Sequence, residues 1–530
     1  MQGLQPLPSG LLSVFTLPLG RLVLRAALAE PFVPANRPKK NTPALPSAPP
    51  APPAPHETAE TDTSGAAVGE EDDDDESVDS FFSRRFGDAF ARTLGSALVH
   101  GIYAADSRLL SLRAAFPQLH ASEARGNGSV IWGELGPSAW FGSKAGANSS
   151  AKSQQEGQEE EQEVEDREWE TRLVRTAALF SFREGMETLV RGLVEALRGF
   201  PNVALRSGAA VRGIGIDATA DNGDDDDDRC SFQVRGFRLF FILCVALRLS
   251  SQIYLDAEGE DGGTPLGATH VISALPLPVL DSILQAKAGA TAVATEGGAS
   301  TTHTSLPHLR ANPHSSVTVL NLVFPISPPN NDNNNSTGEQ PITTPTPLHP
   351  PGFGYLIPRP ERGYPEPGRE DEEDPGPGLL GVVFDSASLP EQDQASDDND
   401  AAAAASAAGF IKLTAMLGGP YPFPHARETS ELDAQLVAAV LPRISSQLGH
   451  ALPPPVHYAV HRNAESIPTY LVGHTARMGE LRRALSERWG GRMKVVGAGV
   501  GGVSVADCVK AGRQAAFEVG AQIKSQTRGG

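Results

Sequence analysis

A glycine-rich turn near the carboxyl end is the feature that most constrains this chain. Residues 493–496 predict a short strand, which the run Gly497-Ala498-Gly499-Val500-Gly501-Gly502 joins to a helix. The first, third and sixth residues of the run have the glycine spacing of a dinucleotide-binding turn. Because no second strand fits between this helix and Gly530, we expect only part of such a unit. The segment should aim a helix N-terminus, with its partial positive charge, at an electron-rich ligand.

Composition narrows the function classes. The 530 residues suffice for two or three domains, and 54 glycines and 44 prolines predict much loop. Cys230, Cys244 and Cys508 are too few and too scattered for a disulfide framework or a metal site. The formal net charge of -20 argues against nucleic acid as a partner, because phosphate binding needs clustered Lys and Arg. The sequence has no His-Glu-x-x-His, Gly-x-Ser-x-Gly or Walker motif. No motif therefore indicates a zinc protease, a serine hydrolase or a nucleoside triphosphatase.

Low-complexity stretches interrupt the chain, as though a compact enzyme carried inserts in its surface loops. Several are acidic runs that hold most of the negative charge and are too polar to join a core. The inserts and runs span residues 43–55, 70–76, 146–168, 159–170, 224–228, 289–304, 328–351, 370–374 and 392–408.

Two segments bear on membranes and targeting. The longest apolar run, 239–247, has about half of the roughly 20 residues that span a bilayer, so only a monotopic contact is expected. The first 29 residues contain Arg21 and Arg25 and no acid, which is the composition of a mitochondrial presequence. Three prolines in the same segment interrupt the amphipathic helix that a presequence needs.

Hydrophobic periodicity predicts helices and an antiparallel sheet. Apolar residues that recur every fourth position from Ser77 onward predict one continuous amphipathic helix with a core-facing stripe. The stripe consists of Val78, Phe82, Phe86, Phe90, Leu94 and Leu98. Residues 188–197 predict a shorter helix. Strands are predicted at 203–205, 211–216, 231–234 and 270–273, and an antiparallel sheet from 316–324, 379–384 and 411–416. Together with the terminal strand, turn and helix, these elements predict a mixed α/β enzyme with interleaved domains.

The histidines indicate no catalytic site. The 13 histidines are isolated from one another in the sequence, so we interpret one such as His474 as a structural or surface group rather than a catalytic base.

A series of landmarks, in order along the chain, resembles the oxygen-dependent protoporphyrinogen oxidases. The most specific are Gly352-Phe353-Gly354-Tyr355-Leu356-Ile357-Pro358 and the closing segment Gly502-Val503-Ser504-Val505-Ala506-Asp507-Cys508-Val509. The other landmarks lie at 75–87, 100–106, 110–113, 271–276, 384–386, 389–393, 467–470, 473–474 and 512–516. Each match alone is modest, and their common order across nearly the whole chain makes the resemblance specific.

The resemblance implies a flavoenzyme of the amine oxidase superfamily that binds FAD without a covalent bond. Such an enzyme oxidises protoporphyrinogen IX to protoporphyrin IX in heme biosynthesis, with oxygen as the acceptor. The implied fold is of the FAD-linked oxidase type, in which FAD-binding, antiparallel-sheet substrate and helical membrane-facing domains interleave. The implied location is the mitochondrial inner membrane, with a peripheral or monotopic contact. The resemblance also allows a homodimer.

The implied domains follow from the positions of these landmarks. Residues 1–168 correspond to the helical region and 169–290 to the central part of the FAD-binding domain. Residues 291–460 correspond to the substrate-binding sheet, and 461–530 to the last part of the FAD-binding domain.

The resemblance also carries site residues over to this sequence. The implied FAD contacts are Val211, Asn463, Gly497, Gly502, Val503, Ser504, Val505 and Asp507. Gly354, Leu356 and Met416 correspond to an apolar pocket for the tetrapyrrole, as a flat apolar macrocycle needs. The alternatives are a terminal helix packed without a ligand and, for the pocket residues, ordinary sheet core. No metal and no acid–base pair is implied, because the flavin carries the hydride chemistry.

Three departures from the family pattern qualify this picture. Members begin with a strand, a Gly-x-Gly-x-x-Gly turn and a helix that hold the FAD diphosphate, whereas residues 3–8 here align with the family's interior. We therefore expect an incomplete gene model or fragment whose FAD affinity is low. Leu12 stands where some members carry an arginine for a propionate, so the carboxylate anchor is unidentified. Residues 235–252 interrupt a family hairpin, and we interpret them as translated intron sequence.

Two other functions stay open at this point. One is a related flavoenzyme that acts on amines or carotenoids. The other is a non-catalytic fragment that binds porphyrin or a membrane but not FAD.

Overall fold

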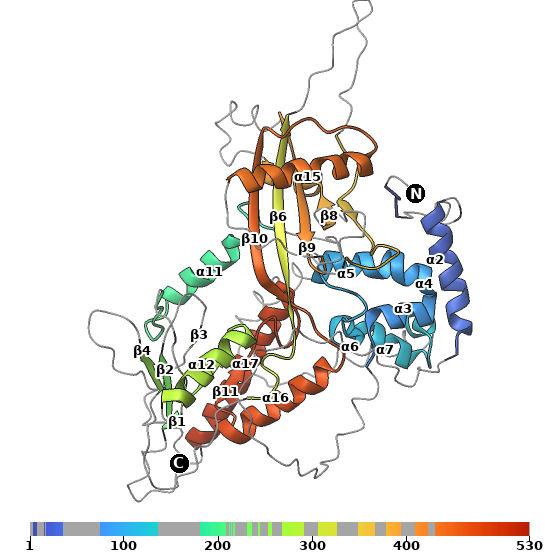
Figure 1. Ribbon diagram of the computed structural model, residues 1–530. Coiled ribbons are helices and arrows are strands. Elements are labelled where there is room, and N and C mark those ends of the chain that lie inside the picture. The colour runs from blue at the N-terminus through green and yellow to red at the C-terminus, as the bar shows by residue number, and fades with distance from the viewer. Residues whose placement is uncertain are drawn as a thin grey trace, which may run out of the picture.

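The structure is a computed structural model that divides into a helical region, an antiparallel sheet and a mixed α/β region (Figure 1). It describes residues 4–7, 15, 17–34, 75–135, 181–207, 211, 214, 216–217, 231–235, 242–243, 253–256, 268–290, 306–325, 348–365, 378–393, 409–421 and 430–528.

The central sheet has five antiparallel strands in the order β10-β6-β9-β8-β7. The strands are β6 (His314–Pro325), β7 (Gly354–Leu356), β8 (Leu379–Val383), β9 (Phe410–Gly418) and β10 (His457–Pro468). The three strands expected from alternation are confirmed as β6, β8 and β9. The structure adds β7 and β10 at the two edges.

One face of this sheet is covered by α15 (Ser430–Leu448), which lies across the upper part of the molecule (Figure 1). Leu320 and Leu413 from the sheet are fully buried against Val440 and Ile444 from the helix. Because side chains alternate along a strand, Val319 and Met416 point to the opposite face, where they are only partly buried. That face carries the second half of the candidate site.

The helical region has a hydrophobic core of its own, which includes Val78, Phe81 and Val99. Its elements are α2 (Pro18–Ala29), η1 (Glu30–Phe32), α3 (Val78–Phe86), α4 (Asp88–Phe90), the π-helical turn η3 (Ala91–Gly95), α5 (Ser96–Tyr103), α6 (Leu112–Ala115), α7 (Pro117–Arg125) and α8 (Val130–Leu135). The first of the long run, α3, begins as expected at Ser77, whose hydroxyl accepts a hydrogen bond from the Ser80 amide at 3.1 Å.

The prediction of one continuous helix over 77–98 is wrong. Gly87, with φ of 90°, ends α3 and the chain restarts as α4, because a positive φ does not fit a right-handed helix. The register also shifts within the π-helical turn, so the buried positions become Ala91, Gly95 and Val99. Leu98, the last residue of the expected stripe, is 38% exposed.

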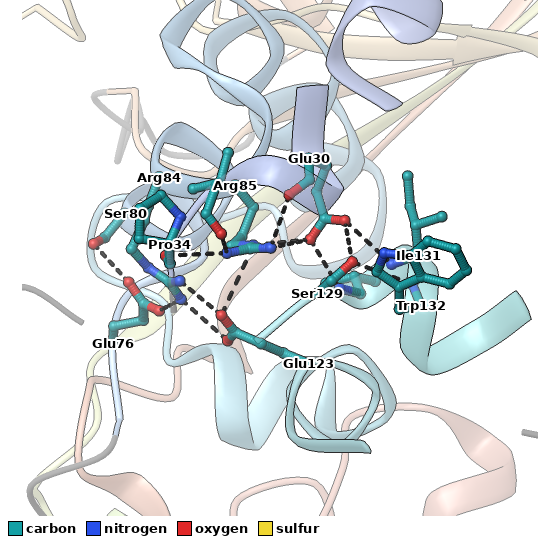
Figure 2. Close-up of polar contacts among 12 residues, drawn as sticks. Glu30, Pro34, Glu76, Ser80, Arg84, Arg85, Glu123, Ser129, Ile131 and Trp132 are labelled. Atoms are coloured by element: carbon teal, nitrogen blue, oxygen red, sulfur yellow. Dashed lines mark hydrogen bonds and ion pairs between the residues drawn. The ribbon is translucent and has the colours of Figure 1, made fainter. Parts of the chain in front are cut away.

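Within this region, a buried ion pair joins η1 to α3 (Figure 2). The side chains of Arg85 and Glu30 are fully buried, and Arg85 Nε donates to Glu30 Oε1 at 2.9 Å. The same carboxylate accepts from the Ser129 hydroxyl at 2.6 Å and from the Val130 amide at 2.8 Å. Burial alone would raise the pKa of Glu30, but these hydrogen bonds and the Arg85 charge outweigh it and hold the pKa below its usual range.

The remaining elements form the α/β region at the lower end of the molecule (Figure 1). β11 (Met493–Val495) pairs in parallel with β5 (Val271–Ser273), and β3 (Ile242–Leu243) pairs antiparallel on the other side of β5. A second small sheet has the order β1-β2-β4. It consists of β1 (Ile216–Asp217), β2 (Ser231–Arg235) and β4 (Ile253–Asp256).

Four helices accompany these sheets, and two short ones follow β8. The four are α11 (Glu187–Arg198), α12 (Leu277–Ala290), α16 (His474–Trp489) and α17 (Val505–Arg528), and the short ones are α13 (Asp385–Ser388) and η4 (Pro390–Asp393).

Most predicted elements of this region are confirmed, and two are wrong. The terminal strand and helix appear as β11 and α17, the helix at 188–197 as α11, and the strands at 231–234 and 270–273 as β2 and β5. Residues 203–205 form no strand. In the segment 211–216, the described residues Val211 and Ile214 lie outside any strand, and β1 includes Ile216 and Asp217. Within the presumed insert 235–252, the described residues include β3, which is hydrogen-bonded to β5. In the described part of the chain, no helix combines the length and the apolar character needed to cross a bilayer.

The buried ion pair predicts a large stability effect. Arg85→Met should lower the free energy of unfolding by about 3–5 kcal/mol, because it leaves the Glu30 carboxylate buried without its counter-charge. Urea denaturation of the two proteins measures this difference. The control is Arg191→Met, which breaks the exposed ion pair with Glu184 and should cost less than about 1 kcal/mol. Equal losses in the two variants would contradict the role given to the buried pair.

Candidate functional site

The glycine turn continues directly from β11 and is held against the end of β5. The Val496 amide donates to the Ser273 carbonyl at 2.9 Å, and the Val500 amide turns back to the Gly497 carbonyl at 3.0 Å. Gly497 and Gly502 have φ values of 111° and 144°, which L side chains rarely adopt. The predicted turn is therefore built where the sequence placed it, at the carboxyl ends of two parallel strands.

Close contacts add a second reason for glycine in the turn. A Cβ at Gly502 would overlap the Asp507 side chain, and a Cβ at Gly499 would lie 3.0 Å from the Leu277 side chain. The backbone of the turn thus approaches α12 and the start of α17 more closely than a residue with a side chain could.

The N-terminus of α17 is capped by its own residues. The Asp507 amide donates to the Ser504 hydroxyl at 3.1 Å, and that hydroxyl donates to Asp507 Oδ2 at 2.6 Å. The Ser504 amide also reaches Asp507 Oδ2 at 3.3 Å. This reciprocal arrangement is a capping box. The Asp507 carboxylate offsets part of the positive end of the helix dipole, while the amides of Val505 and Ala506 have no acceptor within the helix itself.

Tyr470 and His474 support the turn from behind. Their rings stack with centroids 4.1 Å apart and 13° between planes, and their residues are 1% and 3% exposed. The Tyr470 hydroxyl donates to the Ala498 carbonyl and accepts from the Gly502 amide at 3.0 Å. Burial raises the pKa of Tyr470 to well above its usual value, so the hydroxyl stays protonated.

His474 is a neutral histidine with both ring nitrogens bonded. Nε2 lies 3.1 Å from the Val500 carbonyl, which can only accept, and Nδ1 lies 2.9 Å from Asn312 Nδ2. Nε2 therefore carries the proton, and Nδ1 accepts from the Asn312 amide. Burial lowers the pKa of His474 to about 4. The residue is a structural support of the turn, which agrees with its interpretation from the sequence as a structural rather than a catalytic histidine.

The three predicted pocket residues lie together on the partly buried face of the sheet. Strand pairing aligns Leu356 with Gly381, Gly381 with Met416, and Met416 with Val319. Gly354 lies two positions along β7 from Leu356 and so on the same face. A Cβ at Gly101 of α5 would come within 2.9 Å of the Leu356 side chain, so α5 covers this end of the row. Leu356 is nevertheless 41% exposed.

The two halves of the site are connected by the chain that leaves β10. Ile467 of β10 packs with Ala104 and Val317 beside the sheet, and Tyr470 follows within three residues. The Ser111 amide donates to the Tyr470 carbonyl at 2.7 Å, which ties the same segment to the helical region. Tyr103 at the end of α5 approaches the Tyr470 ring edge-on at 6.2 Å.

The other predicted residues lie around these parts. Val503 packs on the helical core, and Val211 packs on the core cluster that Val500 also touches. Asn463 is exposed on the edge strand β10, opposite Val317 and at the start of a bulge. The structure thus places Val211 and Val500 of the turn against one core cluster, Val503 against another, and the pocket residues on one sheet face. Asn463 lies apart from the pocket residues, on the opposite edge strand from β7.

Sequence reasoning missed the support given by Tyr470, Asn312 and Tyr103. The signal was present in part, because Tyr470 and His474 belong to the landmarks 467–470 and 473–474. Their bonds to residues 498–502 join positions more than 25 apart in sequence, which no local pattern reveals.

Comparison with known proteins finds distant relatives of this chain. The chain matches no protein-family model. It is 28% identical over 453 residues to the protoporphyrinogen oxidase of Homo sapiens, which covers 84% of this chain and 69% of that protein. The enzyme of Bos taurus is 27% identical over the same length, and that of Schizosaccharomyces pombe is 22% identical over 462 residues. The chain is a distant homologue of protoporphyrinogen oxidases.

Solved structures add little to this relationship. One from Exiguobacterium sp., assigned as a protoporphyrinogen oxidase, has a TM-score of 0.48 at 18% identity and covers 87% of this chain and 69% of that one. A likeness at this level carries no argument about function. The distant sequence relationship therefore stands on its own.

The low pKa of His474 predicts a pH-dependent stability. Its folded-state pKa of about 4 lies below the unfolded value of 6.5, so the unfolded chain takes up the proton first as the pH falls. The stabilisation is complete above pH 6.5 and declines toward pH 4. At pH 5 the wild type should have lost about 2 kcal/mol through this residue relative to pH 7.5.

The measurement compares urea unfolding of the wild type and His474→Gln at pH 7.5 and pH 5. Acidification should cost the variant about 2 kcal/mol less than the wild type. The other buried histidines are unchanged in both proteins and cancel in the comparison. Equal losses would contradict a buried neutral His474.

Proposed function

We propose that this protein is an FAD-dependent oxidase that converts protoporphyrinogen IX to protoporphyrin IX in heme biosynthesis, with oxygen as the electron acceptor. The observation that carries the proposal is the pairing of two features in one chain. One is a turn that requires glycine, followed by the N-terminus of α17, and the other is an apolar row on the partly buried face of the sheet. The distant homology to protoporphyrinogen oxidases supports the specific substrate.

The residues of the turn fit the flavin ring of FAD. Gly497 and Gly502 give the turn its shape through positive φ values, and the segment that leads into α17 would offer the amides of Val503 and Val505 and, in exchange for its bond to Asp507, that of Ser504. These amides would face the pyrimidine end of the ring, where negative charge gathers on reduction. Val211 and Asn463 would contribute further contacts. Asp507 would act by capping the helix rather than by bonding the flavin.

Bound FAD would supply the hydride acceptor. The task of the protein is then to position the macrocycle and to exclude water. Leu356 and Met416, two strands apart in one row, would offer apolar contacts to the macrocycle, and Leu356 is 41% exposed. Gly354 would shape the same end of the row, because a Cβ there would overlap the Val382 carbonyl oxygen.

A second candidate is a related flavoenzyme that acts on amines or carotenoids, since these share the flavin frame. A third is a protein that binds porphyrin without FAD, and one observation favours it. The Asp507 carboxylate at the start of α17 reduces the attraction of this helix for negative charge. The assay below separates the three.

The experiment follows protoporphyrin fluorescence after addition of protoporphyrinogen to the protein reconstituted with FAD. Fluorescence should rise faster than in the protein-free control, whereas amines should not reduce the flavin. Gly502→Ala should weaken FAD binding about 10- to 100-fold, because the new side chain meets Asp507 and the backbone conformation costs about 1–3 kcal/mol.

The matched control for this variant is Gly512→Ala in α17, where an added Cβ meets no atom within 4 Å. Its FAD affinity should equal that of the wild type. A wild-type protein that binds FAD but leaves porphyrinogen unoxidised would contradict the proposed substrate. A wild type that binds porphyrin and no FAD would favour the third candidate.

A peripheral contact with the mitochondrial inner membrane is proposed as part of the same function. α2 and η1 present Leu28 and Phe32, which are 65% and 84% exposed, beside Arg21 and Arg25. An apolar and basic face of this kind suits an anionic membrane surface.

Sedimentation with vesicles of phosphatidylcholine and phosphatidylserine tests this contact. The wild type should sediment with the vesicles, and Leu28→Glu with Phe32→Glu should stay in the supernatant. Val456→Glu, at an exposed apolar residue of the distant sheet end, should behave as the wild type. Wild-type protein that stays in the supernatant would exclude the contact.

A further inference from the structure

We propose that Tyr470 and His474 are positioning residues that hold the glycine turn in its ligand-ready shape before FAD arrives. The proposal rests on the proposed function for the identity of the ligand, and it extends the structural support that these two residues give the turn to a role in ligand binding. It explains how a turn with no polar side chain of its own is held at the junction of three parts of the molecule.

Three hydrogen bonds hold the turn, at alternate residues. The Tyr470 hydroxyl bonds the Ala498 carbonyl and the Gly502 amide, and His474 Nε2 bonds the Val500 carbonyl. A glycine-rich backbone has many accessible conformations, so fixing it costs more conformational entropy than fixing other residues. Side-chain bonds from a rigid support reduce the conformations that remain for the ligand to select.

Tyr470 and the residues up to His474 are themselves hydrogen-bonded to the helical region. The Ser111 amide donates to the Tyr470 carbonyl at 2.7 Å, and the Gly473 amide donates to Asp75 Oδ2 at 2.7 Å. The same Asp75 oxygen accepts from the Ser111 hydroxyl at 2.7 Å. Residues 470–474 are therefore anchored to the helical region and in turn anchor the glycine turn.

This chain of contacts sets where the flavin lies relative to the substrate wall. Tyr470 and His474 follow β10, whose Asn463–Ile467 segment runs along the sheet that carries Met416. A shift of the turn would move the flavin without changing the wall itself. Loss of the support should therefore reduce the rate of flavin reduction more than the affinity for the porphyrinogen.

The test uses Tyr470→Phe, which keeps the stacked ring and removes the hydroxyl bonds to the turn. The matched control is Tyr355→Phe, which removes a buried hydroxyl whose bond to Gln447 lies on the α15 side of the sheet. Hydrogen exchange of the peptide covering residues 497–505 in the FAD-free protein should become about tenfold faster in Tyr470→Phe, as expected for the loss of about 1.4 kcal/mol of protection. Exchange of this peptide should not change in Tyr355→Phe.

With FAD and porphyrinogen, Tyr470→Phe should lower FAD affinity and kcat several-fold and leave KM nearly unchanged. His474→Phe, which retains a stacking ring and loses the bond to Val500, should act in the same direction. Unchanged turn exchange in both variants, relative to Tyr355→Phe, would overturn the proposal. Faster exchange with unchanged FAD affinity and kcat would also overturn it, because the support would then be merely structural.

Failure of the proposed function gives a different pattern. If the wild type binds no FAD, the assigned ligand is wrong. The exchange measurement then decides alone whether Tyr470 and His474 hold the turn.

Discussion

The placement of the candidate site depends on one physical constraint, the need to satisfy the backbone of a glycine turn at a crowded junction. Buried N–H and C=O groups must find partners, and a glycine-rich loop offers no side chains to provide them. The stacked pair Tyr470 and His474 supplies these partners from a neighbouring segment. Since that segment connects β10 to α16 and contacts the helical region, the same bonds align all three parts of the molecule.

Charge at the start of α17 sets a second limit on function. A bare helix N-terminus favours negative charge, but here Ser504 and Asp507 form a capping box. The cap stabilises the helix in the absence of a ligand. Because the Asp507 carboxylate offsets part of the helix dipole, any attraction for negative charge comes from individual backbone amides near the start of α17. A neutral ring that gains charge only on reduction suits such a site better than a permanent anion does. This reading is consistent with assigning the isoalloxazine, rather than a phosphate, to the turn.

The sequence predicted those features that rest on local patterns. Alternating residues in β6 and β9 identified the half-buried sheet, and glycine spacing identified the turn between β11 and α17. The edge strand β10 was missed because residues 463–466 are all exposed and include three polar side chains, so the alternation is broken within the strand. The break at Gly87 was missed because its φ of 90° is a property of the packed helices and not of the apolar spacing.

Features that join distant residues were out of reach of such patterns. Arg85 is fully buried because it pairs with Glu30, which lies 55 positions earlier in the chain, and no local pattern reveals that pairing. The row Leu356, Gly381 and Met416 exists only through the register of three strands. The resemblance named the outer two residues of this row, and the structure supplied the glycine between them.

The most direct test of the central claim is a crystal structure of the protein with FAD. We expect the pyrimidine end of the isoalloxazine to lie within about 3 Å, a hydrogen-bonding distance, of the amide of Val503 or Val505, or of the Ser504 amide in place of its bond to Asp507. We also expect residues 497–502 to keep the bonds to Tyr470 and His474. A flavin bound elsewhere, with these amides facing only solvent or Asp507, would contradict the account.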